Sequence, residues 1–494
     1  DSDIQVPNDI NSFLWGQYVV PTEGGVWQKS NWQNIRNINY FMTHYQSVQA
    51  AEADVNIYVA EMRFFRALEY FNKIQLLGDV PWLEVDLNVD SEELYGPKMK
   101  RNQVFQKIIE DLDFAIQWLP EAGSEEANRL NKDIARHVKA RFCLNEGTHY
   151  KYHDELEYAS EAEKWLQMAA TESDKLITSR RYEIYNTGHP QEDYFNMYRI
   201  DDKSDLKEAV LYVDYKTNIR EHNMAAAGRE AGCGFSKSFV ESFLCSDGLP
   251  ISLSNKYLGD ETMRKETANR DPRLKQLILT NDFPTNVTDD LKDSTFVVNE
   301  DEFITQHCFT GYRPIKGFNP IYSQALYMKS SFDGIAYRYA ETLLINAEAK
   351  AELNTITNAD LDRTVNQLRD RVGMPHLTVN VGFTDPKWPD WGYSLSPILQ
   401  EIRRERCIEL AGEGFRFNDL KRWKAGKLLN NVLTYVGKRK PDGNLAIVYP
   451  NYTNPDLSYQ AGKSRTWEDK MYLYPIPTGE LQRNPQLLPQ NPGW

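Results

Sequence analysis

The 494-residue chain carries 71 acidic and 57 basic side chains, and its net charge of −14 excludes a protein that relies on a basic surface for nucleic acid or anionic lipid. Its 41% hydrophobic and 26% charged residues are typical of a globular protein, and no apolar run reaches the length of a membrane span. The five scattered cysteines contain no C-x-x-C pair, which excludes a zinc ribbon and a thioredoxin-like motif.

Five helices are predicted in the first third of the chain, because apolar residues recur there every three or four positions. They span about 32–45, 54–77, 101–119, 132–150 and 157–178. Gly78 and Pro81 should end the second helix, since glycine favours the position after a helix and proline cannot continue one.

Helical periodicity fades between about 182 and 330, where Gly, Pro, Asn and Asp mark turns around short strand-like pieces such as 209–215. Three further helices are predicted at 337–351, 358–372 and 395–411. A hairpin is expected, with T-Y-V-G-K-R-K (434–440) and N-L-A-I-V-Y (444–449) flanking Pro441-Asp442-Gly443. The Pro-rich tail from Pro475 should contain no regular helix. Alanines where helices would pack closely predict repeated helical hairpins of the tetratricopeptide kind, although no strict 34-residue period is present.

Several separated motifs resemble those of one protein family. They are A-E-M-R-F-F-R-A-L-E-Y-F-N-K-I-Q-L-L-G-D-V-P-W (60–82), C-S-D-G-L-P-I (245–251) followed by N-R-D-P-R-L (269–274), R-Y-A-E-T-L-L-I-N-A-E-A (338–349), the charged segment 401–423 and the tail 472–494. Together, and in this order, they resemble the SusD/RagB family of Bacteroidota outer-membrane nutrient-binding lipoproteins. The likeness covers nearly the entire chain.

This resemblance implies a mostly α fold, a superhelix of four tetratricopeptide-like helix pairs with a long irregular region of short strands and loops between the third and fourth pairs. We therefore expect a single domain over residues 1–494. Its parts would be the first three helix pairs (30–180), the irregular insertion (181–335), the fourth pair and following helices (336–425), and a hairpin with a Pro-rich C-terminal strap (426–494).

The resemblance also implies a partner and a location. Family members bind glycans at the cell surface, are generally not enzymes, and pair with a TonB-dependent, SusC-like β-barrel transporter. They are extracellular-facing outer-membrane lipoproteins anchored through an N-terminal lipidated cysteine. This chain begins at Asp1 in a polar segment, with no signal peptide and no cysteine before Cys143. We therefore expect a processed or truncated chain, in which the anchor was removed or never existed.

No enzyme or cofactor motif is present: the chain lacks H-E-x-x-H and G-x-S-x-G, and we expect no cofactor and no catalytic residue. His149 and His153 lie four residues apart and could bind a metal, but an exposed, solvated helix end is the stronger interpretation, so no metal is predicted. Glutamates at helical spacing after position 401 should form ion pairs on a helix face. They are Glu405, Glu409 and Glu413.

Sugar binding requires flat apolar rings rimmed by hydrogen-bonding groups, and aromatic residues in loops are the best candidates. The predicted glycan-binding residues are Trp15, Tyr18, Trp27, Trp82, Tyr95, Trp388 and Trp391. A further group lies in the irregular region at Tyr257, Tyr312 and Tyr322, whereas Phe415, Phe417 and Trp423 should pack in the core. The alternative for each loop aromatic is packing against the helical scaffold.

The sequence thus predicts non-catalytic binding of oligosaccharides at the outer-membrane surface, with delivery to a SusC-like transporter. A peptide-binding protein for peptide uptake is the alternative, because a tetratricopeptide-like groove can bind peptides. A glycoside hydrolase is less favoured, because paired carboxylates cannot be placed from one sequence.

Overall fold

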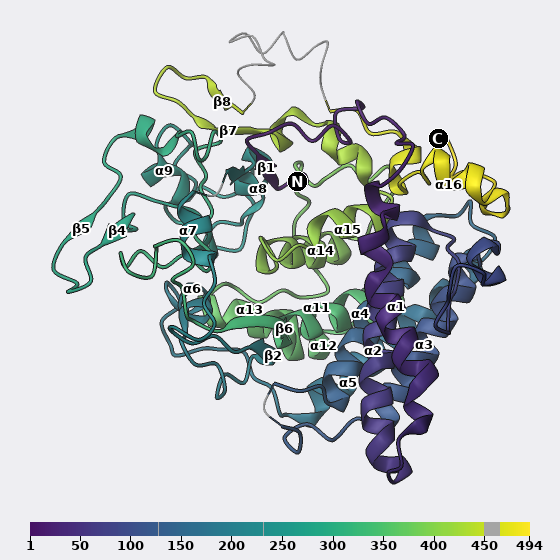
Figure 1. Ribbon diagram of the computed structural model, residues 1–494. Helices are drawn as coiled ribbons and strands as arrows, with labels where there is room; N and C mark the ends of the chain where they lie inside the picture. The colour runs from purple at the N-terminus through teal and green to yellow at the C-terminus, as the bar shows by residue number, and fades with distance from the viewer. Residues whose placement is uncertain (127, 231, 449–464) are drawn as a thin grey trace. The chain divides into compact units, whose positions relative to one another are not determined.

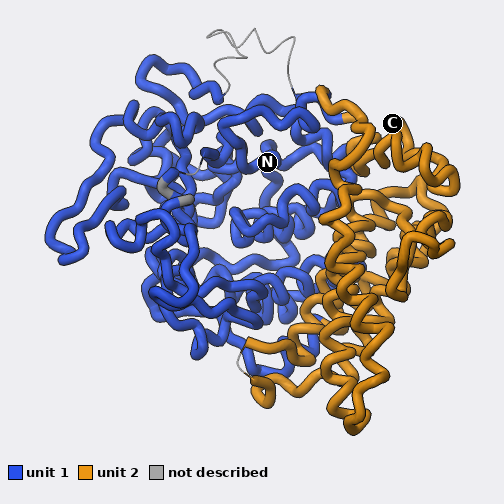
Figure 2. The backbone as a smooth tube through the Cα atoms, in the orientation of Figure 1, with its two compact units in different colours: residues 1–16, 173–467 blue, residues 17–172, 468–494 orange. Residues whose placement is uncertain are grey.

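The computed structural model describes residues 1–126, 128–230, 232–448 and 465–494, and Figure 1 shows its helices, strands and loops. The chain forms two compact units, coloured separately in Figure 2. Unit 1 contains residues 1–16 and 173–467, and unit 2 contains residues 17–172 and 468–494. Within the described residues, no helix is both long enough and apolar enough to cross a membrane.

Unit 2 is built from long helices that pack in sequence order (Figure 1). They are α1 (Gln33–His44), α2 (Glu52–Leu77), α3 (Arg101–Trp118) and α4 (Lys132–Tyr152), followed by α5 (Ala162–Ser179), which continues into unit 1. Helix α1 packs on α2, α2 on α3 and α3 on α4. The ring of Phe71 on α2 also stacks on that of Phe142 on α4, with centroids 3.6 Å apart. The five predicted helices are confirmed, and Gly78, at φ 75°, ends α2 as expected.

The C-terminal tail belongs to unit 2 and corrects one prediction. A short helix, α16 (Thr478–Arg483), and a 3-10 turn, η12 (Pro485–Leu487), interrupt the strap that was expected to contain no regular helix. Pro477 precedes the first helical residue and Pro485 follows the last, so neither proline removes a hydrogen bond inside α16. The Asn491 side chain donates to the carbonyl of Leu77, which fixes the tail to the end of α2.

Unit 1 combines short helices with paired strands. Its helices are α6 (Asp193–Asn196), α7 (Met224–Arg229), α8 (Lys237–Ser242), α9 (Met263–Thr267), α10 (Arg273–Leu277), α11 (Tyr339–Glu352), α12 (Asn358–Arg363), α13 (Val365–Val372), α14 (Pro397–Glu409) and α15 (Arg416–Arg422). The helices predicted at 337–351 and 395–411 are confirmed. The one predicted at 358–372 is two helices, because Thr364 adopts φ −130° and ψ −97° between α12 and α13.

The strands of unit 1 form two-stranded antiparallel pairs. These are β1 (Gln5–Pro7) with β3 (Cys233–Phe235), β2 (Ala209–Val213) with β6 (Gly334–Arg338), β4 (Asn286–Val287) with β5 (Ser294–Thr295), and β7 (Val436–Arg439) with β8 (Leu445–Ile447). The predicted strand at 209–215 and the predicted hairpin are confirmed. The last residue of that hairpin prediction, Tyr449, lies outside the described residues.

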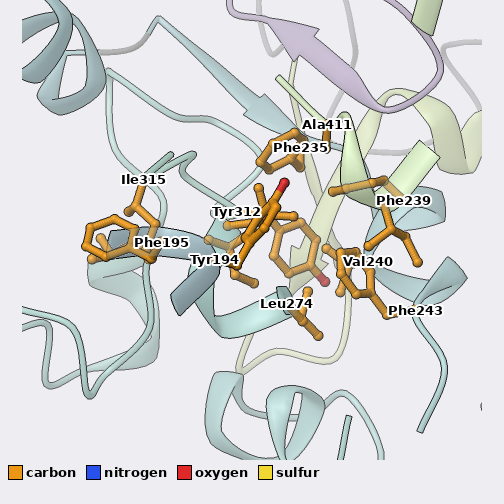
Figure 3. Close-up of a cluster of buried hydrophobic side chains, with 14 of the residues drawn as sticks. Tyr194, Phe195, Phe235, Phe239, Val240, Phe243, Leu274, Tyr312, Ile315 and Ala411 are labelled. Atoms are coloured by element: carbon orange, nitrogen blue, oxygen red, sulfur yellow. The ribbon is translucent and has the colours of Figure 1, made fainter. Parts of the chain in front are cut away.

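A cluster of buried side chains forms the core of unit 1, and the irregular region supplies most of it. Figure 3 shows Phe235, Phe239 and Tyr312 in this cluster, and the rings of Phe235 and Phe239 lie 4.7 Å apart. Tyr312 is fully buried, so its ring is not open to a ligand, unlike the exposed loop aromatic that the sequence suggested. The irregular region therefore contributes buried core side chains as well as exposed loop residues such as Ile219 and Leu291.

A network of buried ion pairs surrounds Glu409 of α14. The Glu409 carboxylate accepts hydrogen bonds from Arg371 at 2.6 and 2.7 Å, from Arg338 at 2.7 Å and from Arg273 at 3.0 Å. Burial raises the pKa of Glu409, but the three arginines outweigh burial and hold this pKa well below its usual range. The predicted ion pairing of this glutamate is confirmed, and its side chain is fully buried.

Candidate ligand-binding site

A cavity of about 580 Å³ lies within unit 1, and its volume falls in the range of small-molecule sites. Its walls come from the loop 385–391, from α8 and α14, and from the 3-10 helices η8 (Gly426–Asn430) and η9 (Val432–Thr434). Asp3 and Ile4 near the N-terminus, Ile251, and Arg416 of α15 (Arg416–Arg422) also line it. Two of the predicted glycan-binding residues, Trp388 and Trp391, therefore meet in one cavity.

Helix α14 positions one wall of the cavity. Ser396 caps the helix by accepting a hydrogen bond from the Leu399 amide, and Pro397 occupies the first helical position, where its missing N–H is not needed. The helix places Gln400, Arg403 and Arg404 along the cavity.

Three hydrogen bonds hold the loop 385–391 against α14. The Trp388 indole donates to Glu401 at 2.7 Å, and the Trp391 indole donates to Gln400 at 2.7 Å. The third bond runs from Arg404 to Asp385 at 2.6 Å. Because these bonds fix both ring nitrogens and the start of the loop, the tryptophan rings have defined positions.

The two tryptophans have different environments. Trp391 is only 5% exposed, and its ring packs edge-on against Trp423 at 5.5 Å and beneath the Arg403 guanidinium at 4.7 Å. Trp388 is half-buried, with Phe383 tilted 6.1 Å away. Trp388 therefore retains accessible surface, whereas Trp391 lines the cavity as a nearly fully buried side chain.

Another part of the lining comes from α8, which presents serine hydroxyl groups and packs on the core of unit 1. Ser236 caps this helix by accepting from the amide of Phe239, a residue that belongs to both the core and the cavity wall. Ser242 donates to the Phe239 carbonyl at 2.6 Å, and Ser238 donates to the Asp3 carbonyl at 3.2 Å. Their oxygen lone pairs can still accept hydrogen bonds from a ligand.

Two titratable side chains of α14, Glu401 and Cys407, have raised pKa values. Burial raises the pKa of Glu401, whose carboxylate accepts from Trp388 and lies 3.3 Å from Arg404. Burial also raises the pKa of Cys407 to about 12, which keeps this cavity-lining residue a thiol at neutral pH.

Known proteins share features of this sequence and fold. The family model described as the SusD family matches residues 176–494. The chain belongs to the SusD family. It is 25% identical over 456 residues to SusD-like protein P2 of Formosa agariphila, covering 90% of this chain and 75% of that protein.

Solved structures of SusD-like proteins share the fold. One from Bacteroides fragilis superposes with a TM-score of 0.75 at 23% identity, covering 100% of this chain and 92% of the other. A SusD-like carbohydrate binding protein from the same species gives a TM-score of 0.72 at 20% identity, covering 99% and 91%. The predicted family and the mostly helical, tetratricopeptide-like fold are therefore confirmed.

Trp15, the third of the predicted glycan-binding tryptophans in unit 1, does not line the cavity of this SusD-family protein. Trp15 is 6% exposed and packs edge-on against Tyr435 with centroids 5.6 Å apart. The expectation that Trp15 presents an open ring is wrong, because Phe13, Leu14 and Trp15 fold together into the interior of unit 1.

The predicted residues of unit 2 form separate aromatic groups. Tyr18 packs edge-on against Tyr474 and Trp494 of the C-terminal tail, with centroids 5.8 and 5.7 Å away. Trp27 tilts against Trp32 at 5.2 Å, and both are half-buried.

Trp82 and Tyr95 follow α2 in unit 2 and differ in exposure. The ring of Trp82 lies 4.1 Å from that of Tyr70, and the cations of Arg66 and Lys107 lie 5.2 and 5.4 Å from its centroid. Tyr95 is 51% exposed. A role for these residues in ligand binding stays a prediction.

The histidine pair also differs from its expected setting. His149 and His153 are buried rather than exposed, with ring centroids 4.1 Å apart, and His153 lies 3.2 Å from Glu155. In the part of the chain that the structure describes, no three His, Cys, Asp or Glu side chains are grouped to hold a metal ion.

Sequence reasoning missed the polar residues of the cavity, among them Asp385, Gln400 and Arg404. The one available signal was the loop D-P-K-W-P-D-W itself, in which two prolines and two tryptophans immediately precede a charged helix. Partners from distant segments, such as Glu241 for Lys387, carry no such local signal.

Proposed function

We propose that this protein binds oligosaccharides without modifying them and that the cavity at Trp388 is a binding site. The observation that carries the proposal is a half-buried tryptophan, fixed through its indole nitrogen, at the wall of a cavity lined by polar side chains. Membership of the SusD family supports it, as does the similarity to a structure described as a carbohydrate binding protein.

The cavity offers both kinds of contact that a sugar ring requires. A pyranose presents an apolar C–H face, which can stack on the accessible surface of Trp388, and a rim of hydroxyls. The Asn431 and Gln400 amides and the Ser242 hydroxyl line the same cavity and can exchange hydrogen bonds with that rim. Affinity should be modest, because each sugar–protein hydrogen bond replaces one to water.

We further propose that the protein acts at the outer face of the outer membrane and passes its ligand to a TonB-dependent, SusC-like transporter. The family resemblance of the whole chain supports this step. Co-expression with a candidate SusC-like transporter tests the proposal. Co-purification of the two chains as one complex is the expected result, and separate elution at micromolar concentrations would contradict it.

Calorimetric titration with oligosaccharides tests the ligand class, and Trp388→Ala tests the site. The variant should bind at least about 10-fold more weakly, because losing the ring removes roughly 1.5 kcal/mol or more of apolar contact. Trp388→Phe keeps a ring but loses the indole hydrogen bond, so its affinity should fall between that of the wild type and that of Trp388→Ala. Tyr327→Ala, which removes a ring that is 76% exposed outside the cavity, is the matched control.

Three results would contradict the proposal. Wild-type protein that binds peptides and no sugar would favour the peptide alternative. Chromatography that shows a bound oligosaccharide being cleaved would indicate a glycoside hydrolase. Equal affinity of Trp388→Ala and wild type would place the ligand elsewhere, provided that both proteins unfold at the same temperature.

A further inference from the structure

We propose that the cavity selects uncharged sugar units and disfavours uronic acids and sulfated sugars. This inference rests on the proposed function and names the ligand class for that site. Sugars that carry carboxylate or sulfate groups are usually recognised by cations that are free to pair with them, above all by the forked guanidinium of arginine. The selectivity therefore depends on which cations of the cavity already have partners.

Cations around the cavity are already neutralised by carboxylates of the protein. Arg404 lies 2.6 Å from Asp385, and the two side chains are only 9% and 4% exposed. On the exposed side, Lys387 lies 2.9 Å from Glu241.

The Arg416 guanidinium is paired even more completely. It donates two parallel hydrogen bonds to the two carboxylate oxygens of Asp3, at 2.8 and 2.7 Å. This geometry uses the fork that would otherwise bind a uronate or a sulfate.

Arg403 is directed into the interior. Its guanidinium lies 3.0 Å from Glu352 with both side chains fully buried, and it stacks over the ring of Trp423 at 4.3 Å. This leaves Lys427 as the lining cation for which no carboxylate of the described residues lies within 4.0 Å. The exposed Asp390 on the same lining carries the opposite charge, so the cavity has no net attraction for an anion.

The paired charges penalise an anionic ligand but not a neutral one. A uronate that paired with Arg404 would have to displace Asp385 and leave a poorly solvated carboxylate, and breaking such a buried pair is costly. A sugar hydroxyl, by contrast, can donate to a carboxylate oxygen that is already paired, because each carboxylate has about four acceptor sites. The net charge of −14 adds long-range repulsion of polyanions.

The experiment compares neutral and anionic oligosaccharides of equal length. Gluco-, manno- and xylo-oligosaccharides are titrated beside oligogalacturonates and sulfated galactan oligomers, each at 20 and 300 mM NaCl. At least one neutral ligand should bind, with its Kd changing less than twofold with salt, because no charge pair forms across the interface. Every anionic ligand should bind at least 10-fold more weakly than the best neutral one.

The outcomes separate the two proposals. An anionic oligosaccharide that binds more tightly than every neutral ligand, in a salt-sensitive manner, would overturn the selectivity and leave the proposed function intact. Absence of binding by sugars of both classes would overturn the proposed function itself, and the selectivity with it.

A charge-release variant tests the stated cause. Glu241→Gln frees the Lys387 ammonium, whose side chain is 51% exposed, and should raise the affinity for oligogalacturonate about 3- to 10-fold at 20 mM NaCl. Asp442→Asn makes the same change in net charge at the exposed turn between β7 and β8, outside the cavity, and should not alter this affinity. An equal increase in both variants would show that overall charge, rather than pairing in the cavity, excludes anions.

Discussion

Replacing Glu409 by glutamine should strongly destabilise unit 1. The carboxylate is fully buried and accepts hydrogen bonds from three guanidiniums, those of Arg273, Arg338 and Arg371. The substitution Glu409→Gln preserves size but removes the negative charge and points an N–H donor at groups that only donate. Removing one partner of a buried ion pair costs about 3–5 kcal/mol, so we expect the free energy of unfolding to fall by that amount at pH 7.

The effect should depend on pH in a defined direction. The arginines lower the pKa of Glu409 in the folded protein, whereas in the unfolded chain a glutamate titrates near about 4.3. The ionised carboxylate therefore contributes its stability fully above that unfolded pKa, and the contribution is lost as pH falls toward the lower folded pKa. The difference between wild type and Glu409→Gln should be largest above about pH 5 and shrink in more acidic buffer.

Urea unfolding followed by circular dichroism at pH 7 and pH 4 measures both effects. Glu183→Gln is the control, because Glu183 pairs with Lys207 at the surface, where both side chains are at least 60% exposed, and such pairs contribute about 0–1 kcal/mol. The reasoning is refuted if Glu409→Gln unfolds at the same urea concentration as Glu183→Gln. It is refuted equally if the difference from wild type grows at pH 4.

Two further substitutions test one unit each: Arg101→Met removes a buried ion pair in unit 2, and Gly437→Ala tests close packing in unit 1. Arg101→Met should lower the free energy of unfolding by about 3–5 kcal/mol, because it strands the Glu146 carboxylate, and adding Glu146→Leu should recover most of the loss in thermal unfolding. Gly437→Ala in β7 should cost about 1–3 kcal/mol, since a Cβ there would overlap the Thr310 carbonyl, whereas Gly334→Ala in β6 meets its nearest atom at 3.6 Å and should unfold near the wild-type temperature.

The long helices could be predicted from sequence because their signal is local. The second helix was predicted at 54–77 and spans Glu52–Leu77, since its apolar residues repeat over seven turns and Gly78 marks its end. Shorter elements depend on distant partners. The strand β2 pairs with β6, more than a hundred residues later, and no local pattern identifies that partner.

The candidate site was predictable only in part, for the same reason. An aromatic loop before a charged helix drew attention to Trp388 and Trp391, and the structure brings both to one cavity. Burial of Trp15 and Trp391 depends on tertiary contacts that a single sequence does not encode locally. The pairing of Arg416 with Asp3 joins residues from nearly opposite ends of the chain.

Helix α14 performs two tasks on different sides. One side carries Glu409 into the buried arginines, and another carries Gln400, Glu401 and Arg404 to the loop that holds Trp388. The ring at the cavity is thus immobilised before any ligand arrives. Little conformational entropy of the Trp388 side chain remains to be lost on binding. Even a weak interaction with a glycan can therefore form quickly and with specificity.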